Sequence, residues 1–191
     1  MRVSAKLVLK AAENGDLEYL TKVVNTDNSF EKSLDWITKV DKKGRTPLHL
    51  SSMNGHIYIV RLIWRIISEF TKDIYARTVY LDVVDHKGRT ALFHAAAGGY
   101  LNICSYLVDR HAKMDVCTNE NHPSPGSTGL MACAEKNNVD CFKMLFRKGA
   151  GIACPFGWAF GGGVSKRCRD PWHTRMHRHD TSLERLPMRS M

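Results

Sequence analysis

One stretch of the chain, residues 41–68, is an amphipathic unit that cannot bury its own apolar face. It begins with the turn sequence Asp-Lys-Lys-Gly. Thr46 then offers a hydroxyl as a helix N-cap, and Pro47 fits the first helical position, where no amide donor is needed. Gly55 ends the short helix that follows, because glycine reaches a positive φ without steric cost. A second helix begins near His56. Its apolar residues recur at helical spacing: Ile57, Val60, Ile63, Trp64 and Ile67.

The same unit recurs along the chain, which provides the neighbours that the apolar face needs. Residues 85–92 repeat the turn and the cap as Asp-His-Lys-Gly-Arg-Thr-Ala-Leu. Residues 126–130 keep a degraded copy, and residues 11–24 keep the helices without the turn. The position that ends the first helix recurs about every 40 residues, a spacing typical of repeat proteins. It is occupied by Gly15, Gly55, Gly99 and Asn137. The predicted repeats lie near residues 5–24, 41–68, 85–112 and 123–150.

The second unit carries a motif of a known family. Residues 44–49 read Gly-Arg-Thr-Pro-Leu-His, and residues 54–56 read Asn-Gly-His. This pattern closely resembles the ankyrin repeat, which has a period of about 33 residues and the signature T-P-L-H-x-A. The resemblance covers roughly residues 5–152. Because the spacing exceeds the usual period, each junction between repeats is predicted to carry an insertion.

The resemblance implies an all-α fold, an ankyrin-repeat solenoid of helix–turn–helix units with short β-turn fingers. We expect residues 1–152 to form this array, and the first repeat to act as its polar cap. His49 is interpreted as a structural residue of its turn. In the third repeat Phe93 takes the slot of His49 and His94 is displaced by one. This departure argues against a Thr–His hydrogen bond in that turn.

The insertions are predicted to be loops or local cover for the core. In the first, residues 25–40, Trp36 is interpreted as core cover, with a partner-binding anchor as the alternative. In the second, residues 69–84, we expect the preceding helix to continue for a turn or two. The third, residues 113–125, is rich in asparagine and proline and is predicted to be a loop.

Residues 153–191 break the repeat pattern and carry seven basic against three acidic residues. We expect this basic tail, which contains glycine, histidine and arginine, to be disordered. His173 and His177 have the spacing of half a zinc site, but Cys154 and Cys168 are too far apart for the other half. We therefore expect no metal and no cofactor. The abrupt change of composition after the repeats would also be expected at an alternative splice end or in a truncated product.

Composition and cysteine usage limit the class of protein. A content of 43% hydrophobic and 25% charged residues is typical of a folded soluble chain. No apolar run approaches the roughly 20 residues of a membrane helix. Cys104, Cys133 and Cys141 fall in core slots of the repeat helices, which fits a reducing compartment, the cytoplasm or nucleus. No hydrolase, metalloprotease or phosphate-loop signature occurs, so we expect no enzyme activity.

The resemblance implies a protein–protein interaction scaffold that binds through its fingers and concave face. The partner-binding positions carried over from the family are Lys42, Lys43, Arg45, Met53, Asn54, His86, Lys87, Arg89, Ala97, Gly98, Ser124, Ser127, Glu135 and Lys136. The five lysines and arginines on adjacent fingers predict one positive ridge and an acidic partner segment.

Three alternatives remain open at this point. The basic finger residues could merely keep exposed turns soluble. The tail could tether nucleic acid or an anionic membrane, although charge without a docking fold favours neither. The chain could also be a regulatory fragment of a larger ankyrin-containing protein, such as a channel or kinase. The sequence does not set the oligomeric state, and we take a monomer as the default.

Overall fold

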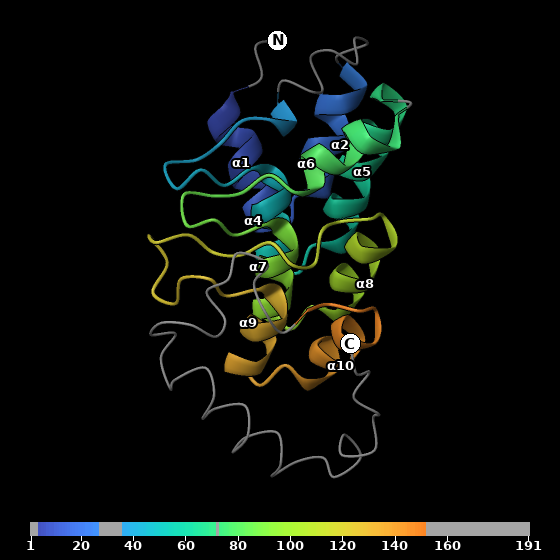
Figure 1. Ribbon diagram of the computed structural model, residues 1–191. Helices are drawn as coiled ribbons and strands as arrows, with labels where there is room; N and C mark the ends of the chain where they lie inside the picture. Colours follow the sequence, from blue (N-terminus) through green and yellow to red (C-terminus); the bar gives the residue numbers. More distant parts are fainter. Residues whose placement is uncertain (1–3, 27–35, 72, 152–191) are drawn as a thin grey trace.

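The computed structural model of the chain describes residues 4–26, 36–71 and 73–151, which contain helices and turns but no strand. Most of the helices follow one another in antiparallel pairs. The pairs are α1 (Ala5–Asn14) with α2 (Leu17–Thr26), α4 (Pro47–Met53) with α5 (Ile57–Phe70), α7 (Ala91–Gly98) with α8 (Leu101–Asp109), and α9 (Gly129–Glu135) with α10 (Val139–Arg147). One further helix, α6 (Ile74–Leu81), follows α5. The pairs are stacked in chain order from one end of the molecule to the other (Figure 1).

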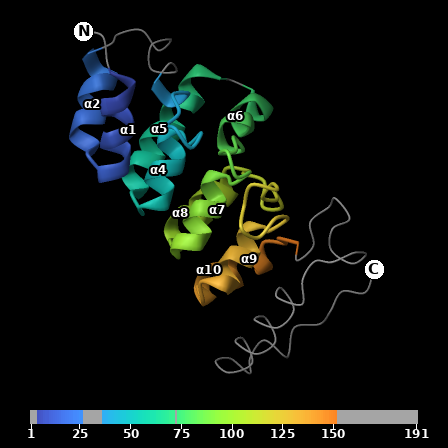
Figure 2. The ribbon, with the colours of Figure 1, turned by 90° about the vertical axis from the view of Figure 1, so that its left-hand side faces the viewer.

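The stack has two layers and a row of loops. The first helices, α1, α4, α7 and α9, contact one another in order, and so do the second helices, α2, α5, α8 and α10. The loops that precede α4, α7 and α9 project from the side of the first helices, on the left of Figure 1, and Figure 2 shows the same stack turned by 90°. The all-α solenoid of helix–turn–helix units predicted from the sequence is confirmed.

Threonine caps set the start of three first helices. The side-chain oxygens of Thr46, Thr90 and Thr128 accept hydrogen bonds from the backbone amides three residues on, at 3.4, 3.2 and 3.4 Å. Each bond satisfies one of the amides that the first turn of a helix leaves without a partner. Ser4, the predicted cap of α1, lies at the N-cap position but makes no side-chain capping bond.

The end of each first helix is covered by the next repeat. Gly55 has a φ of +82°, and an added Cβ there would lie 2.5 Å from the ring of Tyr100, which directly precedes α8. An added Cβ at Gly15, with a φ of +84°, would lie 2.7 Å from the ring of His56 in the same way. Asn137, predicted to take the glycine slot in the fourth repeat, has a φ of +61°. The glycines therefore allow both the chain reversal and the close approach of the neighbouring repeat.

Polar side chains also reach back across the repeat boundaries. Nε2 of His56 shares a 3.0 Å hydrogen bond with the carbonyl oxygen of Glu13. In the equivalent position of the last repeat, Nδ2 of Asn138 donates to the carbonyls of Ala96 and Ala97 at 2.9 and 3.0 Å. These carbonyls lie at the C-terminal ends of first helices, where the helix supplies too few donors for its last carbonyls.

One apolar core runs through all four repeats. Leu48, Leu92 and Leu130, which stand in the same slot of successive repeats, belong to a single cluster and are at most 3% exposed. Cys104 and Cys141 lie in the same cluster, as the interpretation of the core cysteines requires. Stacking rather than any single repeat therefore excludes water from the apolar face.

The insertions differ from one another. Trp36 is 4% exposed and belongs to the core cluster, which confirms the core interpretation over the binding anchor. The second insertion is more structured than expected, because α5 ends at Phe70 and α6 follows as a separate helix. Thr71, the C-cap of α5, is extended with ψ near 117°, so the helix cannot continue. The prediction that the preceding helix simply continues was therefore incomplete, because it did not include the separate helix α6. Residues 113–125 form no helix, as predicted.

Replacement of Gly55 by alanine tests the close approach of the repeats. Gly126→Ala is the comparison, because an added Cβ there meets nothing within 4 Å. We expect this variant to lose about 1 kcal/mol of unfolding free energy from left-handed backbone strain alone. Gly55→Ala adds the clash with Tyr100 and should lower the free energy of unfolding by at least about 2 kcal/mol. Urea unfolding followed by circular dichroism measures both. A double-mutant cycle with Tyr100→Ala is the control, and equal losses at the two glycines would contradict the account.

Candidate functional site

The loops that project from the first helices form three fingers, defined here as residues 41–45, 85–89 and 118–127. A backbone hydrogen bond closes each finger at its base. It runs from the amide of the first residue to the carbonyl of the last, at 3.0, 2.9 and 3.0 Å in chain order. The third finger is longer because it contains most of the third insertion. All three lie on one side of the molecule (Figure 1).

Hydrogen bonds also join each finger to the next. The amide of His86 donates to the carbonyl of Lys43 at 3.0 Å, and the amide of Asn119 donates to the carbonyl of Lys87 at 3.1 Å. Nδ2 of Asn119 adds a 3.1 Å bond to the carbonyl of His86. The three fingers therefore form one hydrogen-bonded strip, which fixes the spacing of the side chains it carries.

A buried carboxylate organises the second finger of this strip. Oδ1 of Asp85 accepts bonds from the amides of Lys87 and Arg89, and Oδ2 accepts from Nε and Nη2 of Arg89 at 2.9 and 2.7 Å. Nε2 of His94 lies 3.1 Å from the same Oδ2. Burial alone would raise the pKa of Asp85, but the hydrogen bonds from His94 and Arg89 outweigh it and hold the pKa well below its usual range.

The first finger repeats this arrangement with a more exposed aspartate. Oδ2 of Asp41 lies 2.6 Å from Nη2 and 2.7 Å from Nε of Arg45, and Oδ1 accepts from the amides of Lys43 and Arg45. Nη1 of Arg45 lies 3.6 Å from Sδ of Met53. The carboxyl and guanidinium groups of each finger therefore form an internal ion pair.

These ion pairs change the predicted positive ridge. Arg45 and Arg89 are 13% and 21% exposed in their side chains, and their charges are balanced inside the fingers. Lys42, Lys43 and Lys87 form no ion pair among the described residues and carry the remaining positive charge. Two of the five basic side chains of the predicted ridge, Arg45 and Arg89, therefore also hold the fingers together. Binding of a partner by the ridge stays a prediction.

His49 links the second repeat to the third. Its Nδ1 accepts a 3.1 Å hydrogen bond from the amide of Thr46, so the ring proton lies on Nε2 and is donated to the carbonyl of Arg89 at 3.1 Å. The ring is 1% exposed, and burial lowers its pKa to about 4. The structural interpretation of His49 is confirmed.

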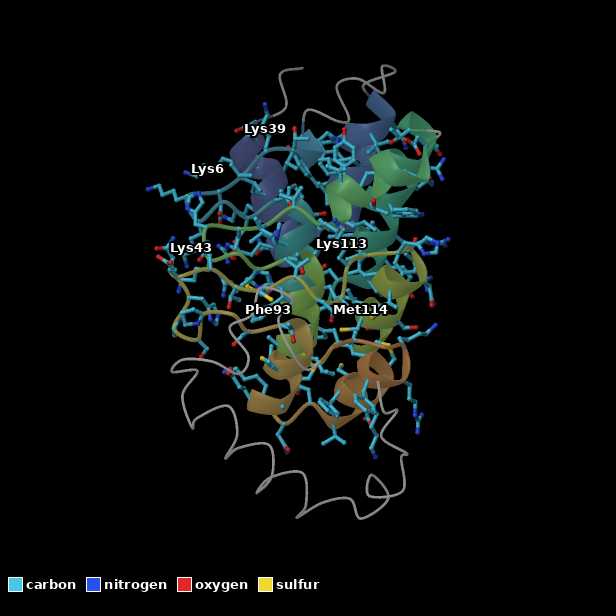
Figure 3. The ribbon with its side chains drawn as sticks, viewed as in Figure 1. Lys6, Lys39, Lys43, Phe93, Lys113 and Met114 are labelled. Atoms are coloured by element: carbon cyan, nitrogen blue, oxygen red, sulfur yellow. The ribbon has the colours of Figure 1, made fainter. Side chains whose placement is uncertain are left out.

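The third repeat uses a different bond in the same place. His94 binds Asp85, and the hydroxyl of Thr90 accepts from the amide of Phe93 instead. Burial lowers the pKa of His94. Phe93 takes the histidine slot and packs edge-on against the ring of His122 in the third finger, with 5.6 Å between ring centres. Figure 3 shows Phe93 at the base of the fingers.

The other predicted contact residues lie in different settings. Lys42, Lys43, His86, Gly98, Glu135 and Lys136 are exposed, whereas Met53, Asn54, Lys87, Ala97 and Ser124 are half-buried. Nδ2 of Asn54 donates to the carbonyl of Glu13, so this side chain also ties two repeats together. Ser127 is 2% exposed and offers no surface to a partner, contrary to its prediction.

Sequence reasoning missed two lysines on the finger side. Figure 3 shows Lys6 and Lys39 on the same side of the molecule as Lys43. Lys6 lies on α1 in a repeat without a finger, and Lys39 belongs to an insertion. Neither lysine stands at a position where the family usually contacts a partner. The repeat register does place α1 in the row of first helices, and this was the available signal for Lys6.

The described residues contain no group of three or more histidine, cysteine, aspartate or glutamate side chains placed to hold a metal ion. The zinc candidates Cys154, Cys168, His173 and His177 lie outside the described residues, as does the whole tail. In the described part of the chain, no helix is long and apolar enough to cross a membrane.

Comparison with known families identifies the repeats. A model of three ankyrin repeats matches residues 65–154, and a single ankyrin-repeat model matches residues 43–68. Together they cover more than half of the chain. The chain therefore belongs to the ankyrin-repeat family.

Individual relatives are similar over part of this chain and are much longer. The human transient receptor potential cation channel subfamily A member 1 is 35% identical over 79 residues, which are 41% of this chain and 6% of the channel. The ankyrin repeat protein nuc-2 of Neurospora crassa is 24% identical over 114 residues, 60% of this chain and 9% of its own length. The chain thus spans a small part of these relatives.

A solved structure shares the fold. One chain in the crystal structure of the yeast ribosomal protein Rps3 in complex with its chaperone Yar1 superposes with a TM-score of 0.65. The two chains are 22% identical, and the match covers 75% of this chain and 91% of the other.

The buried His49 predicts a pH-dependent stability. The unfolded chain binds a proton near the usual pKa of 6.5, and the folded chain only near 4, so lowering the pH between these values favours unfolding. We expect this residue to remove about 3 kcal/mol of stability between pH 7 and pH 4. Urea unfolding across this range measures the loss. In the His49→Phe variant, which copies Phe93 of the next repeat, the fall should be smaller by about that amount, and an unchanged fall would contradict the assignment.

The two finger aspartates predict unequal losses. Asp85→Ala removes a carboxylate that is 0% exposed and leaves Arg89 and His94 without their partner, so we expect a loss of about 3 kcal/mol. Asp41→Ala, with a carboxylate that is 20% exposed and no histidine partner, should cost about 1 kcal/mol. Thermal and urea unfolding compare the two. Equal losses of unfolding free energy would contradict the argument that burial makes Asp85 contribute more to stability than Asp41.

Proposed function

We propose that this ankyrin array is a non-catalytic protein-binding scaffold that holds an acidic segment of a partner against its fingers and concave face. The observation that carries the proposal is the hydrogen-bonded strip of fingers, which presents Lys42, Lys43 and Lys87 close together. The partner segment would lie along this strip and continue over the ends of the first helices. There Met53, Asn54, Glu135 and Lys136 are the proposed contacts, with His86 between the lysines.

The charge of the strip supports an acidic partner. Asp41 and Asp85 balance Arg45 and Arg89, so the lysines give the first two fingers a net positive charge. The third finger carries Glu120, which concentrates the positive charge on the first two. Such a patch attracts acidic partners at long range and opposes basic ones.

The rigidity of the strip supports affinity. The backbone bonds between Lys43 and His86, and between Lys87 and Asn119, hold the finger backbones before a partner arrives. A surface that is already ordered loses less conformational entropy when it binds. The structure of Rps3 with its chaperone Yar1, which contains the same fold, is consistent with a partner-binding role.

The extent and location of the array are also proposals. We infer that the scaffold is residues 1–152, and that the basic tail from residue 153 is a separate segment. Cys104, Cys133 and Cys141 are buried free thiols, whereas Cys117 is disulfide-bonded. The location in the cytoplasm or nucleus therefore rests on the sequence alone and stays a proposal.

Charge reversal on the strip tests the scaffold. The full chain and a Lys42→Glu, Lys43→Glu, Lys87→Glu variant are used to capture proteins from a cell extract, which are identified by mass spectrometry. We expect the variant to lose the partners of the wild-type chain, and those partners to dissociate as salt is raised. Arg45 and Arg89 are left intact, because their reversal would disrupt the fingers.

Two control variants make this experiment specific. Lys22→Glu, on α2 and paired with Glu18, should keep every partner. Deletion of residues 153–191 should also keep them, whereas loss of partners on deletion would favour the tail as a tether. A partner profile unchanged by the triple reversal would contradict the proposal.

A further inference from the structure

A second charged surface lies on the second helices of the repeats, called the outer helices from here on. α5 and α8 pack against each other, on the opposite side of the stack from the fingers (Figure 1). Four side chains from these helices and their ends form an arginine–aromatic cluster: Arg61, Trp64, Tyr106 and Arg110. The guanidinium carbon of Arg61 lies 5.6 Å from the centre of the Tyr106 ring, and that of Arg110 lies 5.1 Å from the same centre. Arg110 also lies 5.6 Å from the centre of Trp64.

The cluster faces outward. Arg61 and Arg110 are exposed, whereas the rings of Trp64 and Tyr106 are half-buried beneath them. Arg65 is also exposed and lies one helical turn beyond Arg61 on α5, so it extends the same face. The aromatic rings therefore form a floor, and the guanidinium groups lie between this floor and the solvent.

The positive charge of this face exceeds the negative charge of its neighbours, Asp109 and Glu69. Arg61, Arg65 and Arg110 form no ion pair within the part of the chain that the structure describes. The neighbouring carboxylate of Asp109 is held by Nζ of Lys148 at 3.0 Å. Three guanidinium groups are thus available to an anionic ligand.

Stacking on the rings prepares these groups for a particular ligand chemistry. A guanidinium over an aromatic face is held by the cation–π interaction and keeps its N–H edge free. That edge matches the two oxygens of a carboxylate, which it binds with parallel hydrogen bonds. Because Tyr106 and Trp64 hold Arg110 in place, less side-chain entropy is lost when a ligand binds.

We propose that the arginine–aromatic cluster, together with Arg65, is a second docking surface, which binds an acidic peptide segment of a partner protein through its carboxylates. Single-stranded nucleic acid is disfavoured, because it binds by stacking its bases on aromatic faces. Here two guanidinium groups cover the Tyr106 ring and one covers Trp64. The proposal does not rest on the finger strip, which lies on the other side of the stack.

A peptide-binding experiment tests the second surface separately from the first. The full chain carries Lys42→Gln, Lys43→Gln and Lys87→Gln as a background, so that the finger lysines do not contribute. The probe is a fluorescent poly-glutamate peptide, and binding is measured by fluorescence anisotropy. We expect this background to bind the peptide. Adding Arg61→Gln and Arg110→Gln should weaken binding roughly tenfold or more, as expected for charge-assisted hydrogen bonds.

Further variants separate recognition from folding and from net charge. Arg61→Lys with Arg110→Lys keeps the charge but loses the planar edge, so we expect it to lose most of the same affinity. Arg65→Gln, outside the stacked cluster, should weaken binding by roughly threefold without loss of thermal stability. If the Arg61→Gln, Arg110→Gln variant does not fold, the affinity of the Arg65→Gln variant tests the proposal instead. Arg147→Gln on α10 is the matched control and should bind as the background does.

Several results would overturn the proposal. One is a background chain that does not bind the peptide, and another is equal binding by the background and the Arg65→Gln variant. Lysine substitutions that preserve full affinity would show that only net charge matters and would exclude recognition by the planar edge. Displacement of the peptide by a poly-thymidine oligonucleotide that binds more tightly would assign the surface to single-stranded nucleic acid.

Discussion

The hydrogen bond from Nε2 of His49 to the carbonyl of Arg89 shows the constraint on which the rest of the structure depends. A repeat of this size has too little apolar surface to fold alone, so its polar groups and its apolar face must both be satisfied by a neighbour. The apolar face is covered through the row of Leu48, Leu92 and Leu130. The polar groups are satisfied by side chains that cross each boundary, such as His56 to Glu13 and Asn138 to Ala96.

The same constraint shapes the surface that the fingers present. A finger remains ordered outside the core because its aspartate binds its own backbone and arginine, and because its backbone binds the next finger. Arg45 and Arg89 are therefore structural in the first instance, and the lysines of the same fingers form no ion pair among the described residues. On the outer helices the opposite holds, since Arg61 and Arg110 stack on aromatic rings and keep their hydrogen-bonding edges free.

The sequence predicts the features that depend on local chemistry. The caps at Thr46 and Thr90 and the left-handed residue at Asn137 follow from residue type and repeat register alone, and the structure confirms them. Contacts between repeats could not be predicted in the same way. The bond between His94 and Asp85 joins residues nine apart through the geometry of a turn, and Arg61 meets Tyr106 only because two repeats stack. The pairing of Arg45 with Asp41 has a local signal, the Asp-x-x-x-Arg spacing, which the prediction of a positive ridge did not use.

Native-state hydrogen exchange of the amides of His86 and Asn119 tests most directly whether the stacked repeats act as one body. Both amides bind only to the preceding finger, so their protection depends on contact between repeats. We predict that they open with a free energy close to that of buried amides in α5 and α8, and that this protection falls in parallel in the Leu92→Ala variant. Exchange of His86 and Asn119 at the rate of an unstructured peptide, while α5 and α8 stay protected, would contradict the account.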